Sequence, residues 1–135
     1  MGAEIRILSG VLARLLEEAR RVPEWECCGL LAGRDDVVTE TFPATNALAS
    51  ATAYEIAPEE LFRIFRQMRA AGLEHMGIYH SHPHGLLWPS VVDIERAWYS
   101  EVAYFILSPR PDAAEPVRAF HIRDGEVFPL RIVPS

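Results

Sequence analysis

The sequence has no long hydrophobic run and no leader-like N-terminus. Within its 135 residues, no apolar stretch approaches the ~18 residues that a membrane-spanning helix needs. The opening "MGAEIRILSG" lacks the basic start and the apolar stretch of a signal peptide. These absences argue against membrane insertion and favour a cytoplasmic location.

Clustered positive charge and a disulfide framework are also missing. The formal net charge is −6, and the basic residues are scattered, apart from Arg20-Arg21 and three arginines of one predicted helix. Because nucleic-acid binding depends on clustered lysines and arginines that neutralise phosphates, we expect no nucleic-acid partner. The two cysteines, Cys27 and Cys28, are adjacent, so a bridge between them would be strained. We expect both to be reduced thiols.

Helical and strand patterns alternate along the chain. The length suits a single domain over residues 1–135. Apolar spacing predicts helices at 9–22, 58–71 and about 90–100. Strands are predicted at 4–8, 27–33, 36–42, 54–56, 75–82 and 102–108, with a hairpin at 117–133 that turns at Asp124-Gly125. We therefore expect one α/β domain with a central mixed sheet and helices packed on it.

Three of the five histidines lie in the segment "HSHPH". Side chains two residues apart on a strand point to the same face, so His80 and His82 can hold one metal ion. By the same alternation, Met76 and Ile78 would anchor this strand in the core. A catalytic zinc takes three protein ligands and a water, and Asp93 is the candidate for the third ligand. Pro83 is expected to end the strand, so we do not predict His84 as a ligand.

Each of these residues also has an ordinary structural interpretation. An isolated H-x-H is a weak indication of a metal. Ser90 and Asp93 match a capping box at a helix start, which does not exclude metal binding by Asp93. Glu26 precedes a buried strand and is a candidate for the base of a hydrolytic zinc site. The alternative is a solvated carboxylate at a strand start, and Glu24, which has the same parity, is the rival base.

Together, these residues resemble the signature of the JAMM (MPN+) metalloproteases. The pattern E…H-S-H-x7-S-x-x-D is reproduced by Glu26, His80, Ser81, His82, Ser90 and Asp93. Pro83 and Pro89 fit its extended form. The segment "ECCGLLAG" resembles the family's E-x-C-G-x-L-x-G strand, which selects Glu26 over Glu24. Asn46 and the "YEI" at 54–56 resemble a stretch of small bacterial members.

The resemblance implies a fold, a set of roles and a substrate class. The fold is a single three-layer domain in which helices flank a curved mixed sheet, as in cytidine deaminases. His80, His82 and Asp93 would bind one zinc ion, Glu26 would act as general base and then acid, and Ser90 would support the oxyanion. Simple members cleave the bond after the C-terminal glycine of ubiquitin-like proteins. Bacterial members act on sulfur-carrier proteins with Gly-Gly tails.

Several points stay open from the sequence. A glycine tail can pair with an exposed strand edge, and the segment 44–56 or the loop 84–89 can offer one. The apolar residues of that loop, including Trp88, either form a substrate wall or pack on the domain. Cys28 shares the face of Glu26 and is taken as a buried thiol rather than a ligand. The alternative function is a non-catalytic MPN-type binding module, and the oligomeric state is unknown.

Overall fold

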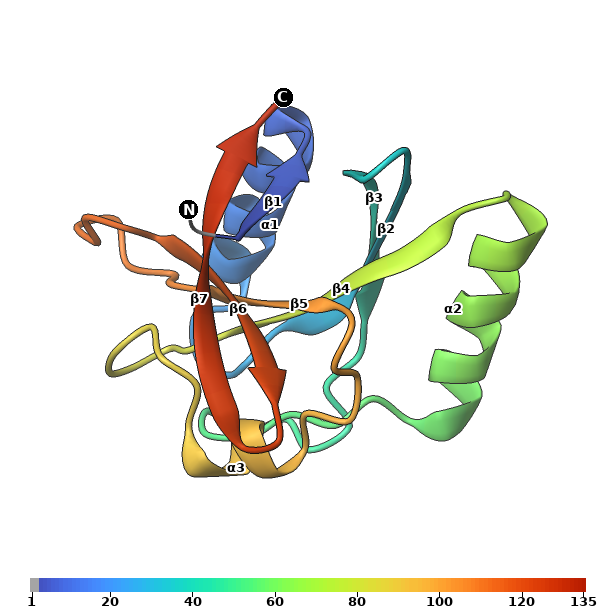
Figure 1. Cartoon of the computed structure of the whole chain (residues 1–135). Helices are drawn as coiled ribbons and strands as arrows, with labels where there is room; N and C mark the ends of the chain where they lie inside the picture. The colour runs from blue at the N-terminus through green and yellow to red at the C-terminus, as the bar shows by residue number, and fades with distance from the viewer. Residues whose placement is uncertain (1–2) are drawn as a thin grey trace.

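Figure 1 shows the computed structural model of the chain, which describes residues 3–135. Met1 and Gly2, which the predicted domain includes, lie outside the described residues. The helices are α1 (Ser9–Arg21), α2 (Pro58–Ala70) and α3 (Val91–Glu95). The strands are β1 (Glu4–Ile7), β2 (Cys28–Arg34), β3 (Val37–Ala44), β4 (Glu74–Ser81), β5 (Ala103–Leu107), β6 (Val117–Arg123) and β7 (Glu126–Pro134). Over the described residues, no helix is long and apolar enough to cross a membrane.

The strands form one mixed sheet that closes on itself. Their order is β1-β3-β2-β4-β5-β6-β7, and β7 pairs in parallel with β1 to complete a barrel. The pairs β1–β3 and β4–β5 are also parallel, whereas the other neighbours are antiparallel. The α/β domain with a mixed sheet is therefore as predicted. The closure was not predicted, because no local pattern marks the pairing of the first strand with the last.

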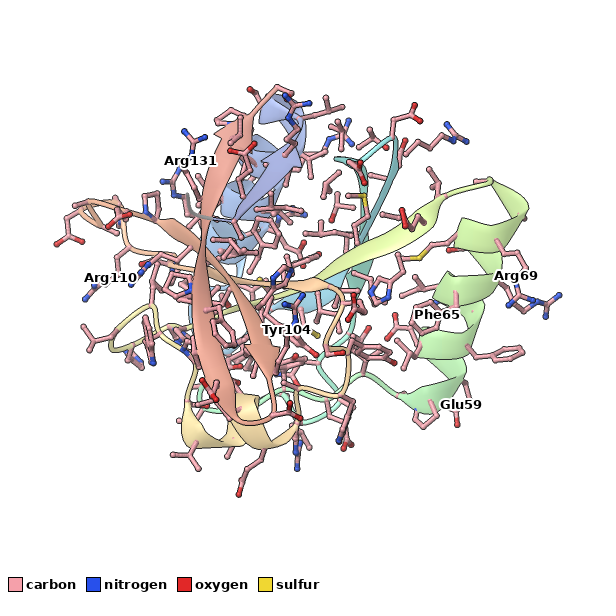
Figure 2. The ribbon with its side chains drawn as sticks, in the orientation of Figure 1. Glu59, Phe65, Arg69, Tyr104, Arg110 and Arg131 are labelled. Carbon is pink, nitrogen blue, oxygen red and sulfur yellow. The ribbon has the colours of Figure 1, made fainter. Side chains whose placement is uncertain are left out.

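The two long helices pack against opposite faces of β2. Leu31 belongs to the buried cluster that α1 covers, whereas Leu30 lies in one cluster with Ile64 of α2. Neighbouring strand residues point to opposite faces, which places the two helices on different sides of this strand. Figure 2 shows Phe65 on the side of α2 that faces the sheet and Arg69 on the opposite side. Helical amphipathicity thus determines how α2 is oriented.

Three local predictions are wrong. The last helix ends at Glu95 instead of near residue 100, and residues 54–56 form no strand. Their contact with the preceding loop includes a single backbone bond, from the Ala47 amide to the Glu55 carbonyl at 2.8 Å. Met76 does not share the face of Ile78, because β4 carries an extra residue opposite β2 at this point. This irregularity turns Met76 toward the cluster under α1.

Candidate active site

Three side chains meet beyond the C-terminal end of β4. The Nε2 atoms of His80 and His82 lie 3.1 Å apart, and each lies 3.1 Å from Oδ2 of Asp93. His80 is almost fully buried, and the other two side chains are about nine-tenths buried. These residues form a group whose ligand atoms could hold a metal ion. The predicted convergence of the three side chains is confirmed.

The donor set fits a metal better than it fits a set of hydrogen bonds. Three atoms that are mutually 3.1 Å apart cannot all be satisfied by the protons available on two neutral imidazoles. Tetrahedral zinc ligands at 2.0–2.1 Å from the ion lie about 3.3 Å from one another, close to the spacing seen here. The Nδ1 of His82 lies 3.0 Å from the Leu86 carbonyl, to which it can donate. That bond leaves the lone pair of Nε2 free for a cation.

A capping box brings Asp93 to the histidines. The Ser90 hydroxyl accepts from the Asp93 amide at 3.1 Å, and Oδ2 of Asp93 accepts from the Ser90 amide at 2.9 Å. This short helix start therefore fixes the carboxylate relative to the strand end. The same oxygen serves the helix cap and faces both imidazoles. The capping interpretation and the ligand interpretation hold together, as the sequence allowed.

The electrostatics of the site are those of a carboxylate among imidazoles. Burial raises the pKa of Asp93, but hydrogen bonds from His80 and His82 outweigh it and hold this pKa well below its usual range. Burial lowers the pKa of His80. For His82, burial also disfavours the charge, but the bond to Asp93 leaves its pKa raised. An ionised Asp93 beside an imidazole whose burial disfavours positive charge is an arrangement that suits a divalent cation.

Glu26 is buried beside this group. Its side chain is 3% exposed, and its Oε1 has no hydrogen-bond partner. Burial raises the pKa of its carboxyl to about 8, an effect that His82 opposes and Asp93 reinforces. The interpretation as a solvated carboxylate is wrong. Glu24, the rival, lies exposed on the surface.

The comparison with known proteins decides the family. The model of the family Prok-JAB, the prokaryotic homologs of the JAB domain, matches residues 8–123. The chain belongs to this family. A desampylase of Haloferax volcanii is 40% identical over 102 residues, which are 73% of each chain. A CysO-cysteine peptidase of Mycobacterium tuberculosis is 32% identical over 131 residues, 94% of this chain and 90% of the relative.

A solved structure agrees with this assignment. The solution structure of a Desulfitobacterium hafniense protein superposes with a TM-score of 0.86 at 28% identity, over 97% of this chain and 92% of the other. The predicted JAMM-type family and the prediction of a peptidase are therefore confirmed.

Two residues of the loop before α2 contact the site of this Prok-JAB domain and had no predicted role there. The Tyr54 ring stacks on His80, with ring centroids 4.7 Å apart and planes at 23°. The Asn46 amide bonds to the Glu26 carbonyl at 3.0 Å. The resemblance included both positions, but the loop lacks periodicity, so nothing in the sequence indicated what they touch.

An apolar cavity of about 340 Å³ opens next to Asp93. Its wall includes Tyr54 and Ile56 from the loop before α2, Tyr104 from β5 and the exposed Trp98 (Tyr104 is labelled in Figure 2). The predicted substrate edge near 44–56 therefore borders a cavity that reaches the metal-ligand group. The Prok-JAB domain thus offers apolar contacts beside its candidate reaction centre.

In the loop 84–89, one apolar side chain packs on the domain and another is exposed. Trp88 packs edge-on against Phe120 at 5.1 Å, and the Arg118 guanidinium lies 5.5 Å from the Trp88 ring centre. Leu86, by contrast, is 84% exposed. Trp88 therefore packs on the domain, although the residue is still 42% exposed, and Leu86 is free to contact a partner. Cys28 is fully buried and lies outside the metal-ligand group.

Proposed function

We propose that this chain is a zinc-dependent peptidase or isopeptidase that cleaves the amide bond after the C-terminal Gly-Gly of a ubiquitin-like or sulfur-carrier protein. The observation that carries this proposal is the meeting of three metal-ligand atoms with a buried, unpaired carboxyl. Two imidazoles and one carboxylate are a ligand set that leaves a coordination position open. A storage or sensor site would have no need of the buried Glu26.

The proposal gives each residue one role. His80, His82 and Asp93 hold a single zinc ion, which when bound polarises the scissile carbonyl and acidifies water. Glu26 takes the proton of the attacking water and returns it to the leaving amine. Ser90 donates a hydrogen bond from its hydroxyl to the developing oxyanion. This donation is compatible with its cap, because a hydroxyl that accepts from the Asp93 amide still has its own proton to give.

The environment of Glu26 suits proton transfer. A general base works best when its pKa is close to the working pH, and burial brings the carboxyl of Glu26 toward that range. Its unpaired Oε1 is free to accept a proton. A bound cation would favour the ionised form and would lower this pKa. The carboxyl would then be charged at neutral pH, as a base must be.

The substrate class follows from the family and from the surface beside the site. The relatives are named as a desampylase and a CysO-cysteine peptidase, and the family resemblance implies Gly-Gly-tailed partners. We propose that the glycine tail lies along the segment 44–56, beside the apolar cavity next to Asp93. Peptide and isopeptide carbonyls are alike, so both bonds fit the same chemistry.

The wider setting belongs to the same proposal. A single domain over 1–135 would carry the activity, with helices flanking the mixed sheet in the three-layer manner of JAMM proteins. A cytoplasmic location is supported by the two free cysteines, since disulfides persist mainly in oxidising compartments. The alternative of a non-catalytic binding module is disfavoured by the complete donor set.

The test is cleavage of sulfur-carrier fusions that extend beyond Gly-Gly, followed by intact mass with and without a chelator. We expect a product that ends at the second glycine and that disappears with the chelator. Metal analysis should find about one zinc per chain in the wild type and a large loss in His82→Ala and Asp93→Ala. Full zinc content in both variants would overturn the ligand assignment. Cleavage that is unaffected by the chelator would overturn the mechanism.

A further inference from the structure

We propose that Asn46 is a positioning residue that fixes the backbone of Glu26 and so aims the base at the reaction centre. This inference rests on the proposed function, because it assigns Asn46 a role through the general base. Asn46 belongs to the loop between β3 and α2, and Glu26 lies just before β2. The two residues are 20 positions apart in the chain.

The side-chain amide of Asn46 uses both its donor and its acceptor. Its Nδ2 donates to the carbonyls of Glu26 and Ala53, each at 3.0 Å. Its Oδ1 accepts from the amides of Leu48 at 3.0 Å and Glu55 at 3.2 Å. An asparagine amide has two donor protons and two acceptor lone pairs, so its capacity is filled. One side chain therefore links the ends of this loop to the residue that carries the base.

The backbone of Glu26 is held by this loop and not by the sheet. Its amide donates to the Ser50 carbonyl at 2.8 Å, and its carbonyl accepts from Asn46. The next residue, Cys27, is already bonded to Ser81 in both directions, at 2.8 and 3.0 Å. The backbone hydrogen bonds of the chain thus go to the loop at Glu26 and to strand β4 from Cys27 onward.

The orientation of the Glu26 carboxyl is not held by a hydrogen bond at its Oε1. Its Oε1 has no hydrogen-bond partner, so no polar contact at that oxygen holds the carboxyl in place. The aim of the carboxyl is then determined by packing and by the backbone from which it projects. A misplacement of about 1 Å in a catalytic group can cost ~10²-fold in rate. Loss of the Asn46 bond should therefore slow the chemical step while leaving substrate binding largely intact.

The contacts of Asn46 also admit a competing explanation. The Ala53 carbonyl that Asn46 binds precedes Tyr54, whose ring stacks on His80. An effect of Asn46 could therefore reach the metal ligands instead of the base. The two routes are separable, because only the route through Glu26 disappears when Glu26 can no longer act as a base.

The experiment compares zinc-loaded Asn46→Ala and Asn46→Asp with a control, Gln67→Ala, on the same Gly-Gly fusion. Asn46→Asp keeps the acceptor for the Leu48 and Glu55 amides but loses the donor to the Glu26 and Ala53 carbonyls, so the loop keeps part of its support. Gln67 carries the same amide group as Asn46 but lies exposed on α2, outside the segment 44–56. We expect kcat to fall ~10- to 100-fold in both Asn46 variants with zinc retained, and KM to change little in Asn46→Asp. The control should behave as the wild type.

Two further measurements decide the outcome. In a Glu26→Gln background, Asn46→Asp should slow the residual rate no further, whereas an equal slowing in both backgrounds would overturn the proposal. In amide hydrogen exchange, the Glu26 amide should lose protection in Asn46→Ala, and the His82 amide, which bonds to the Leu107 carbonyl at 2.9 Å, should not.

The two proposals can fail separately. A wild-type protein that cleaves no Gly-Gly fusion contradicts the proposed function, and the exchange measurement still reports whether Asn46 holds Glu26. Unchanged exchange at Glu26 in both Asn46 variants would overturn the positioning role even if cleavage is robust. Loss of zinc in the variants would show that Asn46 acts through the metal ligands and not through Glu26.

Discussion

Glu24 and Glu26 are two residues apart and have the same strand parity, yet only Glu26 is buried. The burial follows from the start of β2, where the chain passes under the loop that contains Asn46 and Ser50. Burial without a partner at Oε1 costs free energy, and such costs are expected mainly at functional sites.

We expect Glu26→Gln to separate metal binding from chemistry. Glutamine keeps the size of the side chain but cannot accept the proton of water, and loss of a general base typically costs ~10²–10⁴ in rate. Zinc content should stay near one per chain, as measured by metal analysis beside the cleavage assay. Glu24→Gln is the matched control, and its zinc content and cleavage rate should be close to those of the wild type. Loss of zinc in Glu26→Gln would instead place Glu26 among the ligands.

The same carboxyl should make the zinc-free protein less stable as pH rises. Its pKa in the folded state is raised from 4.5 to about 8, so folding favours the protonated form. Stability is then lost as pH rises between these two values, because the folded state retains a proton that the unfolded state releases. In excess chelator, Glu26→Gln should gain in Tm over the wild type as pH increases from about 5 to about 8. A constant difference in Tm across this interval would contradict the prediction.

Ser90 has a cap role in the structure and an oxyanion role in the proposal. We expect Ser90→Ala to keep its zinc and to cleave ~10²–10³-fold more slowly, as is typical when one oxyanion donor is removed. Ser90→Thr keeps a hydroxyl that can both cap and donate, and should be far less affected. If Ser90→Ala cleaves normally and loses only about 1 kcal/mol of stability, the residue is a helix cap and nothing more.

At the scale of single residues, the convergence of His80, His82 and Asp93 was predictable and its surroundings were not. His80 and His82 converge because of strand alternation, and Asp93 joins them through a local capping box. Both rules act over a few residues. The contacts of Asn46 and Tyr54 depend on how an irregular loop lies against two strands, and no periodic pattern encodes that placement.

At the scale of elements, the pairing of β2 with β4 requires a glycine at position 29. Gly29 pairs with Tyr79, whose ring and hydroxyl occupy the space that a Cβ at position 29 would need. The Tyr79 hydroxyl donates to Glu18 of α1 at 2.6 Å, so the ring connects the sheet to this helix. Overfilling this contact would disturb the strand pair that also aligns Cys28 with His80.

We therefore expect Gly29→Ala to lower the free energy of unfolding by about 1–3 kcal/mol, the usual cost of an added group in a packed interior. Gly10→Ala is the control, because a Cβ at this position in α1 meets nothing within 4 Å. This variant should be as stable as the wild type or slightly more stable, since alanine favours a helix. Urea unfolding of the zinc-free proteins measures the stability of both variants. Equal unfolding midpoints for Gly29→Ala and Gly10→Ala would contradict the prediction.

Elements with a strong period were predicted well, and the errors lie where a tertiary contact overrides the local pattern. The two long helices and the Asp124-Gly125 turn occur as expected, with positive φ at both turn residues. The extra residue in β4 places Met76 on the unexpected face, and α3 stops after five residues. Beyond α3, the Tyr99 amide bonds to the hydroxyl of Tyr104 in the next strand at 3.1 Å, a contact that helix propensity does not register.

At the scale of the whole molecule, the metal site should contribute to stability because it joins separate elements. Its proposed ligands come from the end of β4 and from α3. A ligand that binds only the folded state stabilises it by about 4 kcal/mol at 1,000 times its dissociation constant. We expect a chelator to lower the Tm of the wild type by several degrees and to leave His82→Ala unchanged. A chelator that removes the zinc without moving the wild-type Tm would contradict the prediction.

The closure of the barrel has a consequence for how the protein is made. Glu4 of β1 pairs with Arg131 of β7, a separation of 127 residues. Ribosomes add about 5–20 residues per second, so β1 waits on the order of ten seconds for its partner to be synthesised. His80, His82 and Asp93 emerge well before that moment. A nascent chain can therefore carry all its proposed metal ligands while its first strand is still unpaired on one side, so the barrel closes only after the proposed metal site has been synthesised.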